Sequence, residues 1–334
     1  MIITQLNSIT TVKKMINSTQ TLLPRNSNQT IGVSVIIPTH NRIAMLEEAI
    51  SSVFSQDFDG TFEIIVVDDN SQDKTSEVVS KNYPEVKLIS LQQNIGAYAA
   101  RNRALAKTKG KYIAFLDSDD LWDKNYLKSQ ISHLKNKEKC FCVSGLVVWN
   151  TADNQKQIYS QKPNLEKYTS LMHHLLVASF IYTPSSVVIP RQVFEEVGLF
   201  DETIRIGEDA ALYERCIIAG YQPIFTSKPL AIKRKHSSDQ LTNAKNLEKR
   251  KKQRLIRVNK LYPLIEKQFP IVSLQRIYAE IHADFASQYI SQKYFIHWLN
   301  SSIASAMNDS VSYTFLNMLE DIKNLIHKQL MENS

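Results

Sequence analysis

Residues 112–122 read YIAFLDSDDLW, and the prediction of the fold starts from this stretch. Its first part, residues 111–116, is mostly apolar and β-branched or aromatic, a pattern typical of a strand buried on both faces of a sheet. Three carboxylates follow directly, at Asp117, Asp119 and Asp120. The stretch therefore predicts a buried strand that ends in an acidic loop.

Three more runs of the same kind precede this strand, at Val33–Ile37, Phe62–Val67 and Val86–Leu91. Residues 44–56 and 97–108 lie between such runs and carry their apolar side chains at helical spacing. Strands and helices that alternate in this way predict a right-handed βαβ series and a parallel sheet with helices on both faces. The predicted fold class is therefore α/β and Rossmann-like.

Polar residues follow each predicted strand, at positions 39–42, 68–69, 93–94 and 117–119. Ligands of open α/β sheets bind outside the carboxyl ends of the strands. We therefore expect these four strand ends to line one crevice.

The acidic loop is the sharpest chemical feature of the sequence. Carboxylates as close as Asp117, Asp119 and Asp120 repel one another unless a cation neutralises them. Mg²⁺ and Mn²⁺ prefer oxygen ligands and complete their shells with substrate phosphates. An alternative is a capped loop in which Asp117 or Ser118 starts the next helix, so the carboxylates alone leave the metal site open.

At this point the chain resembles the family 2 glycosyltransferases, inverting enzymes with the GT-A fold. The resemblance covers about residues 33–238 and rests on several motifs in order. They read VSVIIPTHNR (33–42), EIIVVDDNSQDKT (63–75), NIGAYAARNRAL (94–105), YIAFLDSDDLW (112–122), GLFDE with GEDAALYERCIIAGY (198–221), and RKHSSDQLT (234–242).

The resemblance implies a nucleotide-sugar site at the strand ends. The implied residues are Pro38, Thr39, Asn41, Arg42, Asp69, Gly96, Arg101, Asp117 and Ser118. Asp69 would accept a hydrogen bond from a uracil N–H and Arg101 would meet the base, while Gly96 permits close backbone approach. The alternatives are that Asp69 only shapes its turn and that Arg101 only solvates a helix.

The resemblance also implies a metal cofactor, Mn²⁺ or Mg²⁺, held by Asp119 with His236 as a further ligand. Asp117 would face the ribose, and Asp120 would be a neighbour or an alternative ligand. An ion that bridges to the diphosphate stabilises the charge of the leaving nucleotide.

Glu208 and Asp209 open a predicted helix that ends at Gly220. Acids in a first helical turn suit the helix dipole, which is a structural explanation for both. The resemblance implies that Asp209 is the catalytic general base, which removes the acceptor hydroxyl proton and gives an inverted product.

The length and composition predict one catalytic domain with an appendage. With 334 residues, 43% hydrophobic and 22% charged, the chain is ordinary for a globular protein. We expect a polar leader at 1–31, a GT-A domain at 32–240 and a helical C-terminal region at 241–334. No signal peptide or membrane span is visible, and the three cysteines make no disulfide framework, so a cytoplasmic location is expected.

The net charge of +7 is concentrated in residues 228–260, which hold twelve Lys and Arg but two acids. Residues 245–260 are therefore a candidate for peripheral contact with an anionic membrane at the inner face of the cell envelope, and a solvated helix face is the alternative. Nucleic acid is not expected as a partner, because aromatic residues do not interleave with the basic ones. Helices from about 274 to 330 are candidates for a homo-oligomer contact.

The expected function is transfer of a sugar from a nucleotide-diphosphate donor, with UDP as the expected nucleotide. The acceptor would be a hydroxyl of a glycan or lipid-linked molecule in surface polysaccharide or glycoconjugate biosynthesis. A sugar nucleotidyltransferase is one alternative function. Such an enzyme is expected to have a Gly-rich phosphate loop after the first strand, but residues 38–42 (PTHNR) contain no glycine. A non-catalytic nucleotide- or glycan-binding protein is another, and the intact Asp119 and Asp209 argue against it.

Overall fold

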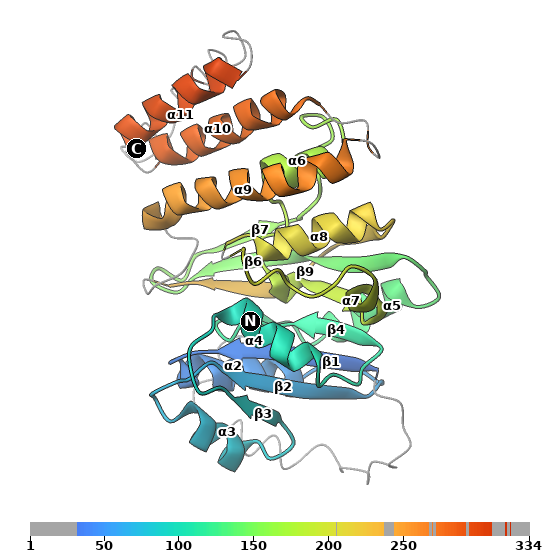
Figure 1. The fold of residues 1–334 in the computed structure, drawn as a ribbon. Coiled ribbons are helices and arrows are strands. Elements are labelled where there is room, and N and C mark those ends of the chain that lie inside the picture. The colour runs from blue at the N-terminus through green and yellow to red at the C-terminus, as the bar shows by residue number, and fades with distance from the viewer. Residues whose placement is uncertain are drawn as a thin grey trace.

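A computed structural model of the chain describes most of its residues. The described residues are 32–204, 206–236, 244–266, 269, 272–291, 294–308, 318 and 321. Figure 1 shows a central sheet with helices on both of its faces and a stack of C-terminal helices at one end of the molecule. The predicted leader, residues 1–31, lies outside the described residues.

The first half of the sheet is the predicted parallel unit. Its strands are β1 (Val33–Thr39), β2 (Phe62–Asp68), β3 (Lys87–Ser90) and β4 (Tyr112–Phe115). They run parallel in the order β3-β2-β1-β4. The helices between them are α2 (Ile43–Phe54), α3 (Thr75–Asn82) and α4 (Ala97–Leu105). These strands confirm the βαβ series that the sequence predicts.

Strands β1, β2 and β4 are buried on both faces, and their side chains alternate between two cores, whereas β3 is a partly exposed edge strand. Val35 and Ile37 of β1 pack in the cluster that contains Leu46 of α2, whereas Ile36 packs with Ala100 of α4. Successive side chains of a strand point to opposite faces, so a run without polar residues fills both cores.

The second half of the sheet is mixed, which corrects the expectation of a wholly parallel sheet. Its strands are β5 (Leu121–Trp122), β6 (Cys140–Asn150), β7 (Lys156–Tyr159), β8 (Val187–Pro190) and β9 (Gln222–Lys235). β8 runs antiparallel to both β4 and β6, whereas β6 and β9 are parallel. The short 3₁₀ helix η1 (Pro184–Ser186) directly precedes β8, and β8 begins beside the end of β4. This reversal brings residues 183–185 to the acidic loop.

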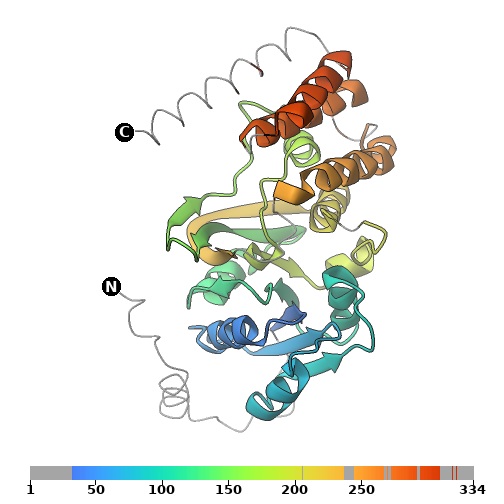
Figure 2. The same cartoon turned by 90° about the vertical axis from the view of Figure 1, so that its left-hand side faces the viewer.

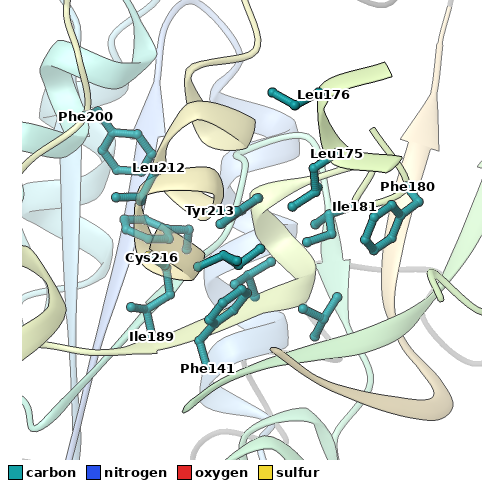
Figure 3. Packing of buried hydrophobic residues seen from close by; sticks show 14 of the residues in the cluster. Phe141, Leu175, Leu176, Phe180, Ile181, Ile189, Phe200, Leu212, Tyr213 and Cys216 are labelled. Atoms are coloured by element: carbon teal, nitrogen blue, oxygen red, sulfur yellow. The ribbon is translucent and has the colours of Figure 1, made fainter. Parts of the chain in front are cut away.

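Short helices cover the second half of the sheet. They are α5 (Tyr126–Leu134), α6 (Leu171–Val177), α7 (Gln192–Glu196) and α8 (Glu208–Ile218). Figure 3 shows side chains of α8 packed in a core with Phe141, Ile189 and Phe200. The rings of Tyr213 and Phe141 stack with their centroids 5.9 Å apart. This packing fixes α8, whose first turn carries Glu208 and Asp209.

The C-terminal region is helical, as predicted. After a 3₁₀ turn η2 (Ala244–Asn246) it contains α9 (Leu247–Ile265), α10 (Leu274–Ser291) and α11 (Phe295–Asn308). Figures 1 and 2 show α9 between α8 and α10. His173 of α6 contacts the Glu280 carboxylate of α10 at 2.5 Å, and both side chains are buried. The predicted domain boundary near residue 240 falls in 237–243, which lie outside the described residues. The helical spacing expected at 322–330 also lies outside them.

Two further observations concern the part of the chain that the structure describes. Its three cysteines are all free thiols. Among its helices, no segment combines the length and the apolar character needed to cross a bilayer.

Candidate active site

Asp119 and His236 meet at the end of the acidic loop. A carboxylate oxygen of Asp119 lies 3.0 Å from His236 Nε2 and 2.8 Å from Arg42 Nη1. Burial alone would raise the pKa of Asp119, but the Arg42 charge and the His236 hydrogen bond outweigh it, so the pKa is lowered. The two residues predicted as metal ligands are thus adjacent, and Asp119 is held as a carboxylate.

Asp120 is the buried neighbour of this pair. Its carboxylate accepts hydrogen bonds from the hydroxyls of Thr183, at 2.9 Å, and Ser185, at 2.7 Å. Burial and the nearby charges of Asp117 and Asp119 raise the pKa of Asp120 to about 7. Asp120 therefore anchors the loop to η1, and its surroundings are less suited to a metal ligand than those of Asp119.

Asp117 pairs with Arg101 of α4. The Arg101 guanidinium contacts a carboxylate oxygen of Asp117 and lies 5.0 Å from the Tyr98 ring centroid. Arg101 is buried, and two of its guanidinium nitrogens have no hydrogen-bond partner. Unsatisfied buried donors are costly in a folded protein, so a ligand that accepts from them is favoured at this position.

Asp69 organises the turn before α4. Its two carboxylate oxygens accept hydrogen bonds from the backbone N–H groups of Ile95 and Gly96, each at 2.8 Å. Gly96 has a φ of +89°, a conformation that glycine adopts without strain. Each carboxylate oxygen keeps a second lone pair, so Asp69 can still accept from a ligand.

Most of the predicted nucleotide-sugar residues line one pocket of about 820 Å³. The lining contains Pro38, Thr39, Arg42, Asp69, Arg101, Asp117, Ser118, Asp119 and Asp209. Asn41 and Gly96 are not part of the lining; the Asn41 backbone N–H donates to Ser71. The third strand end, residues 93–94, does not reach the pocket, and the start of α4 takes its place. The crevice predicted from four strand ends is therefore formed by three of them and by α4.

Asp209 and Asp119 line the same cavity. Within the described part of the chain no hydrogen bond joins the two side chains, and the Asp209 carboxylate accepts a hydrogen bond from the Ala210 backbone N–H. Burial raises the pKa of Asp209, although the Arg101 and Arg257 charges oppose the shift. Its neighbour Glu208 is fully buried, and burial together with the Asp209 charge raises the Glu208 pKa to about 8. A carboxylate with a raised pKa is a stronger base, as proton abstraction requires.

Arg234 has a structural role in this site. Its guanidinium bonds the backbone carbonyl of Asp119, the Glu48 carboxylate and the Met45 carbonyl. Arg234 is buried, so it ties α2 and β9 to the acidic loop. His236, two residues later, is thereby placed beside Asp119.

Comparison with known proteins agrees with this geometry. Residues 34–198 match the family model described as Glycosyl transferase family 2. These residues form a family 2 glycosyltransferase domain. The transferase is 28% identical over 192 residues to the putative teichuronic acid biosynthesis glycosyltransferase TuaG of Bacillus subtilis, covering 57% of this chain and 73% of TuaG.

It is also 42% identical over 106 residues to the UDP-Glc:α-D-GlcNAc-diphosphoundecaprenol β-1,3-glucosyltransferase WfgD of Escherichia coli, covering 31% of this chain and 42% of WfgD. The transferase spans about a third of the length of an uncharacterised Rickettsia conorii glycosyltransferase, to which it is 32% identical over 212 residues, 63% of this chain and 34% of that protein.

Two solved structures share the fold. S. aureus TarS (1–349) in complex with UDP-GlcNAc has a TM-score of 0.57 at 18% identity, covering 87% of this chain and 89% of that one. The mannosyltransferase PcManGT of Pyrobaculum calidifontis, in complex with GDP-Man and Mn²⁺, has a TM-score of 0.55 at 17% identity, covering 94% and 86%. Both confirm the GT-A fold of the transferase.

Sequence reasoning missed several residues of this site in the transferase. Thr183 and Ser185 hold Asp120, and they stand in a Thr-Pro-Ser-Ser segment whose capping chemistry was a usable signal. Arg250, Arg254 and Arg257 line the pocket from α9. Their spacing of four and three residues is visible in the sequence, but it does not reveal which face of the helix turns inward.

Proposed function

We propose that this family 2 glycosyltransferase moves a sugar from a UDP-sugar to an acceptor hydroxyl with inversion, in a reaction that depends on Mn²⁺ or Mg²⁺. One observation carries the proposal: a single pocket is lined by Asp119, which contacts His236, and also by Asp209. A site for the leaving diphosphate and a base for the attacking hydroxyl are thus available in one cavity.

The nucleoside end is assigned to the pocket wall formed by Pro38, Thr39, Asp69 and Arg101. Asp69 is fixed by two backbone amides and retains acceptor capacity for a base N–H. The unsatisfied guanidinium nitrogens of Arg101 offer donors to a base or ribose oxygen. UDP is the proposed nucleotide, in keeping with the UDP-sugars named for WfgD and TarS.

The metal is assigned to Asp119 and His236, whose chemistry fits a divalent ion. A carboxylate with a lowered pKa stays charged, and a neutral imidazole nitrogen is a common metal ligand. Among the described residues no group of three or more His, Cys, Asp or Glu side chains gathers as a metal cage. Two protein ligands suit Mg²⁺ or Mn²⁺, which usually complete their shells with water and phosphate oxygens. When bound, such an ion would stabilise the negative charge of the departing diphosphate.

Asp209 is assigned as the general base. It would take the proton of the acceptor hydroxyl as that oxygen attacks the anomeric carbon from the face opposite to the leaving group, which inverts the configuration. Arg101 and Arg257 lie near enough to lower its pKa, and burial raises it, so the environment keeps the group both ionisable and basic.

The acceptor is assigned to a glycan or lipid-linked molecule of surface polysaccharide or glycoconjugate assembly. The names of TuaG, a putative teichuronic acid biosynthesis enzyme, and of WfgD, which includes a diphosphoundecaprenol-linked acceptor, support this assignment. A cytoplasmic location at the inner face of the membrane would suit such an acceptor. The exposed lysines of α9, Lys249, Lys252 and Lys260, are the proposed membrane contact. A homo-oligomer contact through α10 and α11 stays a prediction.

A panel of nucleotide sugars, each assayed for Mn²⁺-dependent hydrolysis, tests the proposal without a known acceptor. We expect one or a few UDP-sugars to be hydrolysed, and Asp119→Ala to abolish this activity. Cleavage of a nucleoside triphosphate in their place would favour a nucleotidyltransferase. Metal-dependent UDP binding without hydrolysis or transfer for any donor and acceptor would favour a binding protein.

A further inference from the structure

The basic segment of α9 is divided between two faces of the helix. Arg250, Arg254 and Arg257 are spaced by four and three residues, so they share one face, and all three line the active-site pocket. The exposed basic residues of the segment are Lys245, Lys249, Lys252 and Lys260. The arginines thus serve the pocket, whereas these lysines face solvent.

The three arginines differ in how far the protein already satisfies them. Arg257 bonds the Gly207 carbonyl and pairs with Glu214, so it is committed to α8. Arg254 lies 2.8 Å from the Asp284 carboxylate and also bonds the Val177 carbonyl. Arg250 makes no hydrogen bond or ion pair within the described part of the chain.

Arg250 is nonetheless half-buried. Burial lowers its pKa, although the charge of Asp284 opposes the shift. Arginine stays protonated in proteins, so a half-buried guanidinium with open donors in a pocket is available to bind an anion. Planar guanidinium groups bind phosphate through two parallel N–H donors, which makes phosphate the fitting anion.

Two lysines add to the positive lining of the pocket. Lys162 and Lys167 follow β7, are exposed, and line the cavity, and Lys167 also lines a smaller cavity together with Asp284. The Lys167 ammonium lies 5.6 Å from the Tyr168 ring centroid, which holds its stem against the pocket wall. Asp284 is the acid that α10 contributes to the lining. Four cations against this carboxylate give this group of residues a positive surplus, in contrast to the acidic loop that lines the same pocket.

The position of this surplus relative to the base follows from helix geometry. Arg257 contacts Gly207, which directly precedes the Glu208–Asp209 pair. With a rise of 1.5 Å per residue, Arg254 and Arg250 lie about 5 and 10 Å further along α9. The arginines thus follow one another along α9 away from the loop of the base. An acceptor sugar with a phosphate on one carbon and its reactive hydroxyl on another suits this arrangement.

We propose that Arg250 and Arg254, with Lys162 and Lys167, form a subsite for a phosphate or diphosphate of the acceptor, which makes the transferase selective for phosphate-linked acceptors. The inference rests on the proposed function and adds the chemical class of its acceptor. The donor diphosphate is the other source of such an anion, but its proposed site is at Asp119 and His236. A membrane headgroup is disfavoured, because these arginines line a cavity rather than the exposed face of α9.

Phenyl phosphate is the probe for this subsite, titrated by phosphorus NMR into the full chain saturated with UDP and Mg²⁺. Saturation with UDP fills the donor site, so the probe then reports a second anion site. We expect Arg250→Gln to weaken probe binding about tenfold, as loss of one charge-assisted hydrogen bond implies. Arg250→Lys should keep part of the affinity, and UDP affinity should stay the same in both variants.

Lys249→Gln and Lys252→Gln are the matched controls, because they remove the same charge from the exposed face of α9. Both should bind the probe as the wild type does. Equal weakening by all of these variants, or binding of the probe only when UDP is absent, overturns the subsite. Binding to phosphatidylglycerol vesicles that depends on Arg250 more than on Lys249 and Lys252 also overturns it. Failure of UDP itself to bind is a separate signal and contradicts the proposed function.

Discussion

The Arg257 guanidinium on α9 donates a hydrogen bond to the backbone carbonyl of Gly207, across 3.1 Å. Gly207 caps α8 at the turn that presents Glu208 and Asp209. Arg257 also pairs with Glu214, about two helical turns further along α8, at 3.2 Å. The loop of the proposed base is therefore held by the C-terminal helices, outside residues 34–198 that match the family.

Arg257→Met should reduce catalysis more than donor binding. The change frees the Gly207 carbonyl and leaves Glu214 without its partner, but the Glu214 pKa, raised by burial to about 7, lets that side chain take up a proton. Displacement of the base by an ångström can lower the rate by about 100-fold. We expect kcat to fall while the donor KM changes little. Lys260→Met is the control, since Lys260 lies on the same helix and pairs with Asp201 at the surface; an equal loss in both variants would contradict the positioning role.

Gly207→Ala and Gly220→Ala form a matched pair. Both glycines have a left-handed backbone, with φ of +80° and +88°. A Cβ at Gly207 would lie 2.6 Å from Arg257 Nη1, whereas a Cβ at Gly220 meets nothing within 4 Å. Each substitution should lower the free energy of unfolding by about 1–2 kcal/mol through backbone strain. Only Gly207→Ala should also lower kcat. Comparable activity of the two variants would contradict the claim that the contact between Arg257 and Gly207 positions Asp209.

The rate should fall on the acidic side at a higher pH than an ordinary aspartate would give. Asp209 acts as a base only when ionised, and burial raises its pKa above the usual 3.8. Arg257 opposes this shift, so Arg257→Met should move the acidic limb of kcat/KM to still higher pH. The pH profiles of the wild type and the variant measure this. Identical acidic limbs would show that the titrating group does not sense Arg257.

Glu208 should make the fold less stable as the pH rises. The unfolded chain releases this proton near pH 4.5, whereas the folded protein retains it up to about pH 8 because of burial and the Asp209 charge. The contribution of Glu208 is thus fully present below pH 4.5 and is lost as the pH rises through about 8. Melting temperatures of the wild type and Glu208→Gln between pH 5 and 9 test the sign. The wild type should lose more stability than the variant, and an opposite order would refute the buried, protonated state.

The sequence predicts the parallel half of the sheet well because three of its four strands, β1, β2 and β4, are buried on both faces. Runs such as Val33–Ile37 do not alternate regularly between apolar and polar residues, as half-exposed strands do. The turns after them carry residues that line the pocket. Asp119 and His236 were predicted as ligands of one metal, and the structure places a carboxylate oxygen of Asp119 3.0 Å from His236 Nε2. Their role as metal ligands stays a prediction.

The sequence does not predict the direction of β8 or the orientation of α9. A short apolar run such as Val187–Ile189 fits a parallel or an antiparallel strand equally well, so the approach of Thr183 and Ser185 to Asp120 was hidden. The charges of α9 are spread over the helix, and only tertiary packing decides that Arg250 faces the pocket. Such contacts join residues more than sixty positions apart, and local patterns do not encode them.

The most direct test of the central claim is calorimetric titration of UDP, with and without Mn²⁺, into the wild type, Asp119→Asn and Asp209→Asn. The account predicts that Mn²⁺ strengthens UDP binding to the wild type and to Asp209→Asn but not to Asp119→Asn, and that Asp209→Asn binds UDP yet transfers no sugar. Mn²⁺-dependent UDP binding that survives Asp119→Asn unchanged would contradict it.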